Sequence, residues 1–284
     1  MASIALSAAA TPAQAEQPPR RVAGSHSYLR PVLRLASILG CVLLWHLAST
    51  LKLDLGVVRF GNVPSPADTL GGLRAFLGTG DAGRHLLASL ARVGQGFLLA
   101  TLAGVPLGLL VGRFASVRDL AMPPLEIVRP IPAVAWIPLA ILMLPTSEGS
   151  MVFITFLGAF FPILINTAHG VEDVDPRLIA SARSLGAGTG ALFREVIAPC
   201  ALPSIVTGLV LGIGAAWFCL ITAEMISGQF GIGYYTWASY TVQNYDGVVV
   251  GMIVIGLLGM LSSWLVRAFG RVLMPWRIVD GDGR

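Results

Sequence analysis

Three polar side chains stand inside or at the edges of strongly apolar stretches: Arg92, Asn166 and Glu224. A charged group in such a stretch costs a few kcal/mol to place in hydrocarbon and is therefore a functional candidate by default. A guanidinium offers a small oxyanion two parallel hydrogen bonds, so Arg92 suits an anion. We expect the three residues to line a solute pathway. The alternative is a structural role, in which they snorkel to a polar surface or pair within the protein.

The residues that most often perform catalysis show no catalytic spacing. The four histidines are far apart, with no HExxH or GxSxG pattern, and the three cysteines form no CxxC pair. An ATP-binding P-loop needs a lysine after a glycine-rich loop. Lys52, the only lysine, follows no such loop. We expect this chain to be no enzyme and to bind no cofactor or metal of its own.

Composition indicates which solvent surrounds the elements that carry these residues. Of the 284 residues, 55% are hydrophobic and only 12% are charged. Soluble domains carry roughly 25% charged residues, so most of this surface must face lipid. The arginines lie between the apolar stretches, where they set membrane topology, and nucleic acid is not an expected partner. The sequence predicts an all-α, multi-pass membrane protein.

Six apolar segments approach the ~20 residues that a membrane-spanning helix needs. We predict spans at about 31–51, 86–112, 122–144, 150–170, 204–226 and 247–269. Arginines concentrate before the first span, in the loops after the second and fourth, and after the sixth. Because cytoplasmic loops are enriched in Lys and Arg, both termini are predicted to be cytoplasmic. The predicted divisions are a disordered tail (1–27), a first span with an external segment (28–84), a core transmembrane domain (85–275) and a second tail (276–284).

The cytoplasmic segment from Arg177 to Pro203 is too polar to span a membrane. Asp175-Pro176 is typical of a helix start, and Gly186 of a helix stop, which predicts a short helix over 176–186. A second short helix is predicted over 190–198, ended by the prolines at 199 and 203. The first helix has a small apolar face made of Leu178, Ala182 and Leu185. Such a face favours docking into a protein groove over lying flat on lipid.

This segment resembles the EAA loop of ABC importer permeases. The resemblance rests on Ala182-Arg183-Ser184-Leu185-Gly186-Ala187, then Phe193, Val196, Pro199 and Leu202-Pro203. The chain departs from the family pattern at Ala180, where a glutamate is usual, at Ser181, and at Ala198-Pro199. Other stretches, among them Ser89 to Val93, Arg129 to Pro132 and Gly231 to Tyr234, resemble the sulfonate, taurine, nitrate, bicarbonate and cyanate importers.

The resemblance covers about 85–275 and implies a division of labour. The fold would be that of a type I importer permease, with a coupling helix between the fourth and fifth spans. Two permeases, either a homodimer or a pair of paralogues, would form the pathway in a bacterial inner membrane. Two separate ABC ATPase subunits would bind ATP and Mg, and a periplasmic or lipid-anchored binding protein would deliver a small anion. The implied ATPase-coupling residues are Leu178, Ala182, Arg183, Ser184, Leu185, Gly186 and Ala187.

Two other functions remain open at this point. One is a permease of the same family for a different small organic nutrient. The other is a secondary transporter, which needs ion-coupling acids within the spans and commonly shows inverted repeats. No such repeat is evident in this sequence, and acids within the spans are nearly absent.

Overall fold

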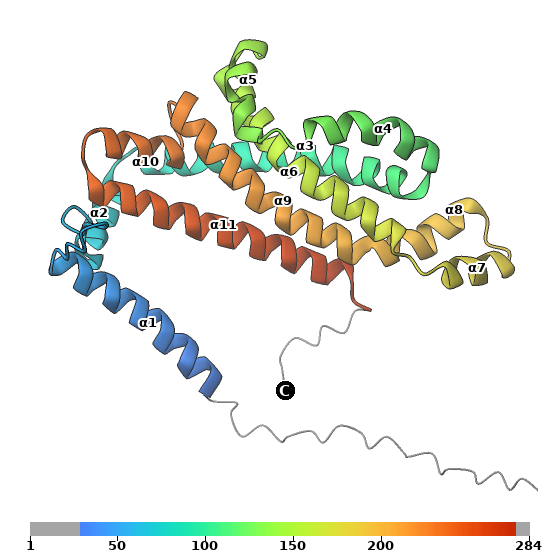
Figure 1. The fold of residues 1–284 in the computed structure, drawn as a ribbon, viewed down its shortest axis with the longest axis horizontal. Coiled ribbons are helices and arrows are strands. Elements are labelled where there is room, and N and C mark those ends of the chain that lie inside the picture. Colours follow the sequence, from blue (N-terminus) through green and yellow to red (C-terminus); the bar gives the residue numbers. More distant parts are fainter. Residues whose placement is uncertain (1–28, 277–284) are drawn as a thin grey trace, which may run out of the picture. The chain divides into compact units, whose positions relative to one another are not determined.

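The computed structural model describes residues 29–276, and its regular elements in that range are helices (Figure 1). They are α1 (Leu29–Thr50), α2 (Pro66–Gly78), α3 (Ala82–Arg113), α4 (Ala115–Val128), η1 (Ala133–Trp136), α5 (Ile137–Met143), α6 (Ser147–Glu172), α7 (Pro176–Ser184), α8 (Thr189–Leu192), η2 (Phe193–Ile197), α9 (Ala198–Ser227), α10 (Ile232–Thr241) and α11 (Tyr245–Leu273). The chain divides after Leu43 into two parts. The helix bundle and the candidate sites lie in the second part, from residue 44 on. The predicted tails lie outside the described residues, apart from position 276.

Five helical stretches are long and apolar enough to cross a membrane, and a bent helix pair brings the total to as many as six. The straight ones are α1, α3, α6, the continuous stretch Thr189–Ser227 and α11. They confirm five of the predicted spans. The all-helical membrane fold predicted from composition is confirmed as well.

The third predicted span, 122–144, is not one straight helix. It consists of the end of α4 and then η1 with α5, and the two pieces meet at an angle of 81°. The break falls at Pro130 and Pro132, and Pro132 has an extended backbone with ψ of 133°. Proline supplies no amide hydrogen and disfavours helix in the residue before it, so two prolines in three residues end α4.

The core of the second part is a helix sandwich in which α6 packs between α3 and α9. Glycines allow the close approach on both sides. A Cβ built on Gly108 of α3 would lie 2.6 Å from the carbonyl oxygen of Leu164, and one on Gly212 of α9 would lie 2.8 Å from a side-chain carbon of Ile163. Both distances are too short for a real side chain. Glycines recur at four-residue spacing on α3 (Gly104, Gly108, Gly112) and on α9 (Gly208, Gly212), and they serve packing within this bundle.

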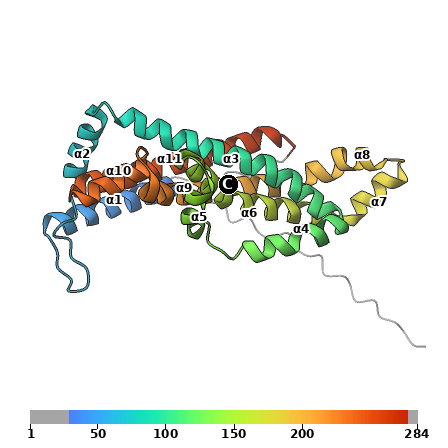
Figure 2. The ribbon, with the colours of Figure 1, turned by 90° about the horizontal axis from the view of Figure 1, so that it is seen from above.

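The two ends of this bundle carry different elements. Helices α7 and α8 lie at the end where α6 finishes and α9 begins (Figures 1 and 2). Helices α2 and α10 lie at the opposite end in both views. A helix rises 1.5 Å per residue, so the axial distance from Glu148 to Glu172 along α6 is roughly 36 Å. That length matches the thickness of a membrane, which places the two ends on opposite faces.

The second predicted helix of the polar segment, 190–198, differs from expectation. It does not end at Pro199, because α8 runs through the π-helical turn η2 directly into α9. The amide of Ala198 donates to the carbonyl of Phe193, five residues back. Pro199 follows this turn as the second residue of α9 and donates no amide hydrogen to the carbonyls of η2. The π turn thus lets the long helix pass through both prolines.

Candidate functional site

Helix α7 is delimited by its own sequence at both ends. The Asp175 side chain accepts a hydrogen bond from the amide of Arg177 (2.8 Å), and Pro176 occupies the first helical position. At the other end, Gly186 adopts a φ of +87°. The Gly186 amide donates to the Arg183 carbonyl and the Ala187 amide to the Ala182 carbonyl, both at 3.0 Å. This pair of bonds is a Schellman cap, which requires the left-handed conformation that glycine adopts freely.

The predicted apolar face of α7 is divided between two environments. Ala182 is half-buried and, with Ile179, packs against the core cluster that contains Leu192. Leu178 and Leu185 instead remain 50% and 89% exposed. A nine-residue helix has too small a face to bury all of its leucines against the bundle. The consequence is an exposed strip at the tip of the polar segment, where a partner could bind.

The other predicted coupling residues flank this strip. Arg183 and Ser184 are exposed, and the Ser184 hydroxyl donates to the carbonyl of Ala180 at 3.1 Å. Ala187 is half-buried beyond the cap. The structure thus brings all seven predicted coupling residues into one capped turn-and-helix unit.

At the opposite end of the bundle, Arg92 of α3 is the centre of a buried polar network. Its Nε donates to Glu148 Oε2 at 2.7 Å, and its Nη2 donates to Glu148 Oε1. Its Nη1 donates to Glu224 Oε1 at 2.8 Å and to the Phe230 carbonyl at 2.5 Å. One guanidinium therefore connects α3 to the first turn of α6, the last turn of α9 and the loop before α10.

Glu224 receives a second set of hydrogen bonds that complete the network. The Ser89 hydroxyl lies 2.8 and 3.0 Å from its two oxygens, and the Gly233 amide donates to Oε2 at 2.9 Å. The same Ser89 oxygen accepts from the amide of Ile232 at 2.9 Å. A buried carboxylate is tolerated only when its lone pairs are satisfied in this way.

The three charged side chains differ sharply in exposure. The side chains of Arg92 and Glu224 are 4% and 0% exposed, whereas that of Glu148 is 65% exposed. One positive and two negative charges meet here, so the network carries a formal charge of −1. The ion pair between Arg92 and Glu224 is buried, so breaking it costs several kcal/mol of stability. The ion pair between Arg92 and Glu148 is exposed on the Glu148 side and contributes little to stability.

Of the three predicted pathway residues, the structure brings two together and leaves the third apart. Arg92 and Glu224 bind each other directly. Asn166 is half-buried on α6 near Gly208 of α9, and its amide donates to the Pro162 carbonyl at 2.8 Å. It is 18 residues from Glu148 along α6, roughly 27 Å at 1.5 Å per residue. Asn166 therefore belongs to the half of the bundle nearer α7.

Sequence reasoning missed Glu148 and Ser89, which complete the network around Arg92. Their partners are distant in the chain, 56 residues between Glu148 and Arg92 and 135 between Ser89 and Glu224. The available signal was weak: an acid just before the fourth predicted span and a serine one helical turn before Arg92.

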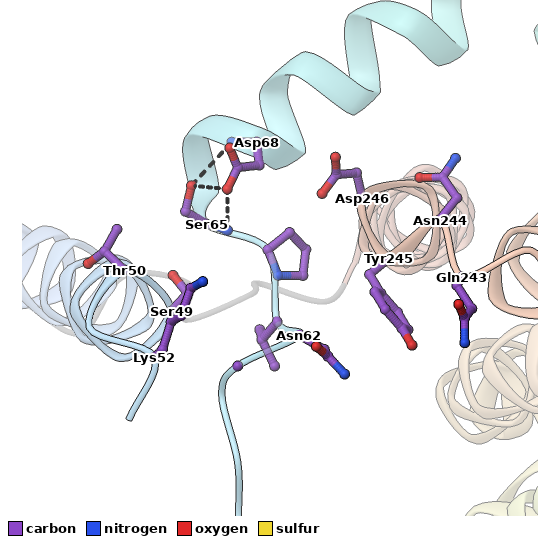
Figure 3. Close-up of a pocket in the computed structure, with 13 residues that line it drawn as sticks. Ser49, Thr50, Lys52, Asn62, Ser65, Asp68, Gln243, Asn244, Tyr245 and Asp246 are labelled. Atoms are coloured by element: carbon purple, nitrogen blue, oxygen red, sulfur yellow. Dashed lines mark hydrogen bonds between the residues drawn. The ribbon is translucent and has the colours of Figure 1, made fainter. Parts of the chain in front are cut away.

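A polar cavity of about 630 Å³ opens beside the start of α2 and the start of α11 (Figure 3). Two of its lining residues, Lys52 and Gln243, have positive φ values of +46° and +58°. Such values are uncommon for residues other than glycine and are often found at binding sites. Asp68 lies in the same wall, where hydrogen bonds from Ser65 hold the pKa of its carboxyl below the ordinary value. The remaining lining residues named in the figure are Ser49, Thr50, Asn62, Asn244, Tyr245 and Asp246.

Within residues 29–276, no group of three or more His, Cys, Asp or Glu side chains could hold a metal ion. The chemistry that these sites offer is hydrogen bonding and charge, at one capped helix and one buried network on opposite ends of the bundle.

Comparison with known proteins agrees with this arrangement. Residues 104–275 match the family of binding-protein-dependent transport system inner membrane components. A relative from Methanocaldococcus jannaschii, provisionally named an ABC transporter permease protein, is 42% identical over 72% of this chain and 77% of its own length. The nitrate import permease protein NrtB of Synechocystis is 32% identical over 75% and 81%. The bicarbonate transport system permease protein CmpB of Synechococcus elongatus is 33% identical over 83% and 88%. This chain therefore belongs to the binding-protein-dependent ABC permease family, as a multi-pass, non-catalytic inner membrane component.

Proposed function

We propose that this chain is the permease subunit of an ATP-driven importer for a small anion of the nitrate, bicarbonate, sulfonate, taurine or cyanate class. Two copies, or one copy and a paralogue, form the pathway. Two separate ATPase subunits bind ATP and Mg and supply the energy. Both termini and α7 lie on the cytoplasmic side. The names of the nitrate and bicarbonate relatives support the choice of an anion.

The observation that carries this proposal is the exposed strip on α7. Leu178 and Leu185 stay exposed at the tip of a helix whose neighbouring residues Ile179 and Ala182 pack against the bundle. A helix that is anchored by part of its apolar surface and exposes the rest suits insertion into a groove of a partner protein. A short connection joins α7 to the end of α6, and α8 with η2 joins it to the start of α9. Movement of the ATPase pair is therefore transmitted to the core of the bundle. Arg183, Ser184 and the cap at Gly186 and Ala187 set the geometry of this contact.

The opposite end of the bundle receives the solute in this proposal. The network of Arg92 and Glu224 and the polar cavity beside Lys52 both lie there, facing the binding protein. Asn166 lies further along the route toward the cytoplasm. Arg92 supplies hydrogen-bond donors for an anion, and the two acids of the network keep the site from retaining it permanently.

As a second candidate, the solute is restricted to the organic members of this class, and one cavity favours it. At the turn between α4 and η1, a cavity of about 280 Å³ is lined by Arg129 together with Trp136, Phe161 and Phe218. Apolar walls with a single cation suit an alkanesulfonate better than a bare inorganic anion. If so, Trp136→Ala reduces uptake of ethanesulfonate more than uptake of nitrate. Equal loss for both anions contradicts this second candidate.

Co-purification tests the primary proposal. The chain is expressed with the ATPase subunit encoded beside it, extracted in detergent and purified through a tag on the permease. We expect a stable complex that Leu185→Glu disrupts, because a carboxylate cannot enter an apolar groove without a partner. The matched control is Thr189→Glu, which adds the same charge at an exposed position at the start of α8, outside the proposed contact. A complex that tolerates Leu185→Glu overturns the proposed contact.

A further inference from the structure

The bond between Arg92 and Glu148 uses the edge of the guanidinium that anions recognise. The Nε and Nη2 groups both donate to Glu148, one to each carboxylate oxygen. This two-point contact is the geometry in which arginine binds carboxylates and other planar oxyanions. The remaining Nη1 edge is used by Glu224 and the Phe230 carbonyl. The Nε and Nη2 edge of Arg92, which suits anions, thus contacts Glu148, while its Nη1 group binds Glu224 and the Phe230 carbonyl in the protein interior.

Glu148 is held in place by little else. Its side chain is 65% exposed, and among the described residues the hydrogen bonds to its carboxylate come from Arg92 alone. Its backbone is fixed independently, because Thr146 caps α6 by accepting from the Gly149 amide at 3.1 Å. The side chain can therefore swing away without unwinding α6. Once released, it remains at the start of a helix, where the dipole stabilises negative charge.

We propose that Glu148 is a built-in substitute for the transported oxyanion, which displaces it from the Nε and Nη2 edge of Arg92. This inference rests on the proposed function, and it specifies the solute: a planar or trigonal oxyanion with two oxygens that match the guanidinium fork. A carboxylate leaves and an anion of similar charge and shape enters. Arg92 keeps the same number of hydrogen bonds throughout.

The network explains why the exchange takes place at Glu148 and not at Glu224. Glu224 is fully buried and has two further hydrogen-bond donors, the Ser89 hydroxyl and the Gly233 amide. Its departure would leave a buried charge unpaired, which is costly. Glu148 moves from one solvated position to another. Exchange also releases the first turn of α6 from α3, so anion capture is linked to the helix whose far end leads into α7.

Anion binding to the purified permease–ATPase complex tests this inference. The complex is titrated with sodium nitrate and, separately, sodium ethanesulfonate, with sodium chloride replaced to keep ionic strength constant. The apparent Kd is taken from the rise in unfolding temperature. Glu148→Gln removes the competing charge and keeps the shape. We expect it to lower the Kd for nitrate about tenfold, the factor that corresponds to about 1.4 kcal/mol.

Matched variants make the result decisive. Glu148→Asp keeps the charge and is expected to stay closer to the original Kd than Glu148→Gln. Glu148→Ala, which removes the group altogether, is expected to tighten binding as Glu148→Gln does. Unchanged or weaker nitrate binding in both neutral variants overturns the inference. That outcome leaves ATP-driven import intact, whereas absence of ATP-driven import by the unmodified complex refutes the proposed function, whatever anion the variants bind.

Discussion

Replacement of Gly186 by valine isolates the backbone geometry of the α7 cap. Gly186 has a φ of +87°, and a Cβ built there meets no atom within 4 Å. Any effect of a side chain at this position therefore comes from backbone strain and not from a clash. A residue with a Cβ pays about 1–2 kcal/mol in the left-handed region, and a β-branched residue is especially unfavourable there.

That strain acts on a helix with little stability to spare. Nine residues are too few for a helix to persist alone in water, so α7 depends on its cap and on the contact of Ile179 and Ala182 with the bundle. A loss of 1–2 kcal/mol lowers the ratio of capped to uncapped helix by a factor of about 5–30. The spans are untouched, so membrane insertion should not change.

The assay measures transport-coupled ATP hydrolysis by the reconstituted complex, together with the amount of ATPase subunit that co-purifies. Gly186→Val is expected to reduce both by about the factor given above. Gly186→Asn is the matched control, because asparagine tolerates the left-handed conformation and should retain most of the activity. Full activity in Gly186→Val, or equal loss in the asparagine variant, would refute the reasoning.

Three further predictions follow from the other end of the bundle. Glu224→Ala should lower the free energy of unfolding in detergent by about 3–5 kcal/mol, because it removes the buried acceptor shared by Arg92, Ser89 and Gly233. Glu148→Ala should cost no more than about 1 kcal/mol; equal losses would contradict the assignment of one buried and one displaceable pair. Lys52, the only lysine, should react with an amine-specific reagent more slowly once the binding protein docks, measured by peptide mapping; an unchanged rate would place docking elsewhere. The Asp68 carboxyl has a lowered pKa, so the capping box of α2 should persist at pH 5 and be lost as the pH falls through that pKa. Hydrogen exchange at α2 detects this loss, and Asp68→Asn should show the fast exchange already at pH 7.

Much of this fold could be predicted from the sequence because hydropathy alone identifies a spanning helix. The first, second, fourth, fifth and sixth spans lie close to their predicted positions. The signals at Asp175-Pro176 and Gly186 placed α7 correctly because both act locally, through one side chain and one dihedral angle. The third predicted span falls on a bent helix pair, because its hydropathy is continuous while Pro130 and Pro132 break its backbone.

The site was less predictable because its interactions are formed by packing. The sequence singled out Arg92 and Glu224 separately, but it could not indicate that they bind each other or that Glu148 completes the set. Likewise, the periodicity of Leu178, Ala182 and Leu185 describes one face, and only the contact with the core around Leu192 divides that face into a packed part and an exposed part.

The central claim is that ATP hydrolysis by separate subunits supplies the energy for transport. Uptake by proteoliposomes tests this claim most directly. The permease is reconstituted with its ATPase subunits, and the binding protein is added outside with radiolabelled candidate anion. We predict accumulation only when ATP and Mg are present on the ATPase side, and its loss in Leu185→Glu. Accumulation by the permease alone, driven by a proton or sodium gradient without ATPase subunits, would identify a secondary transporter and contradict the account.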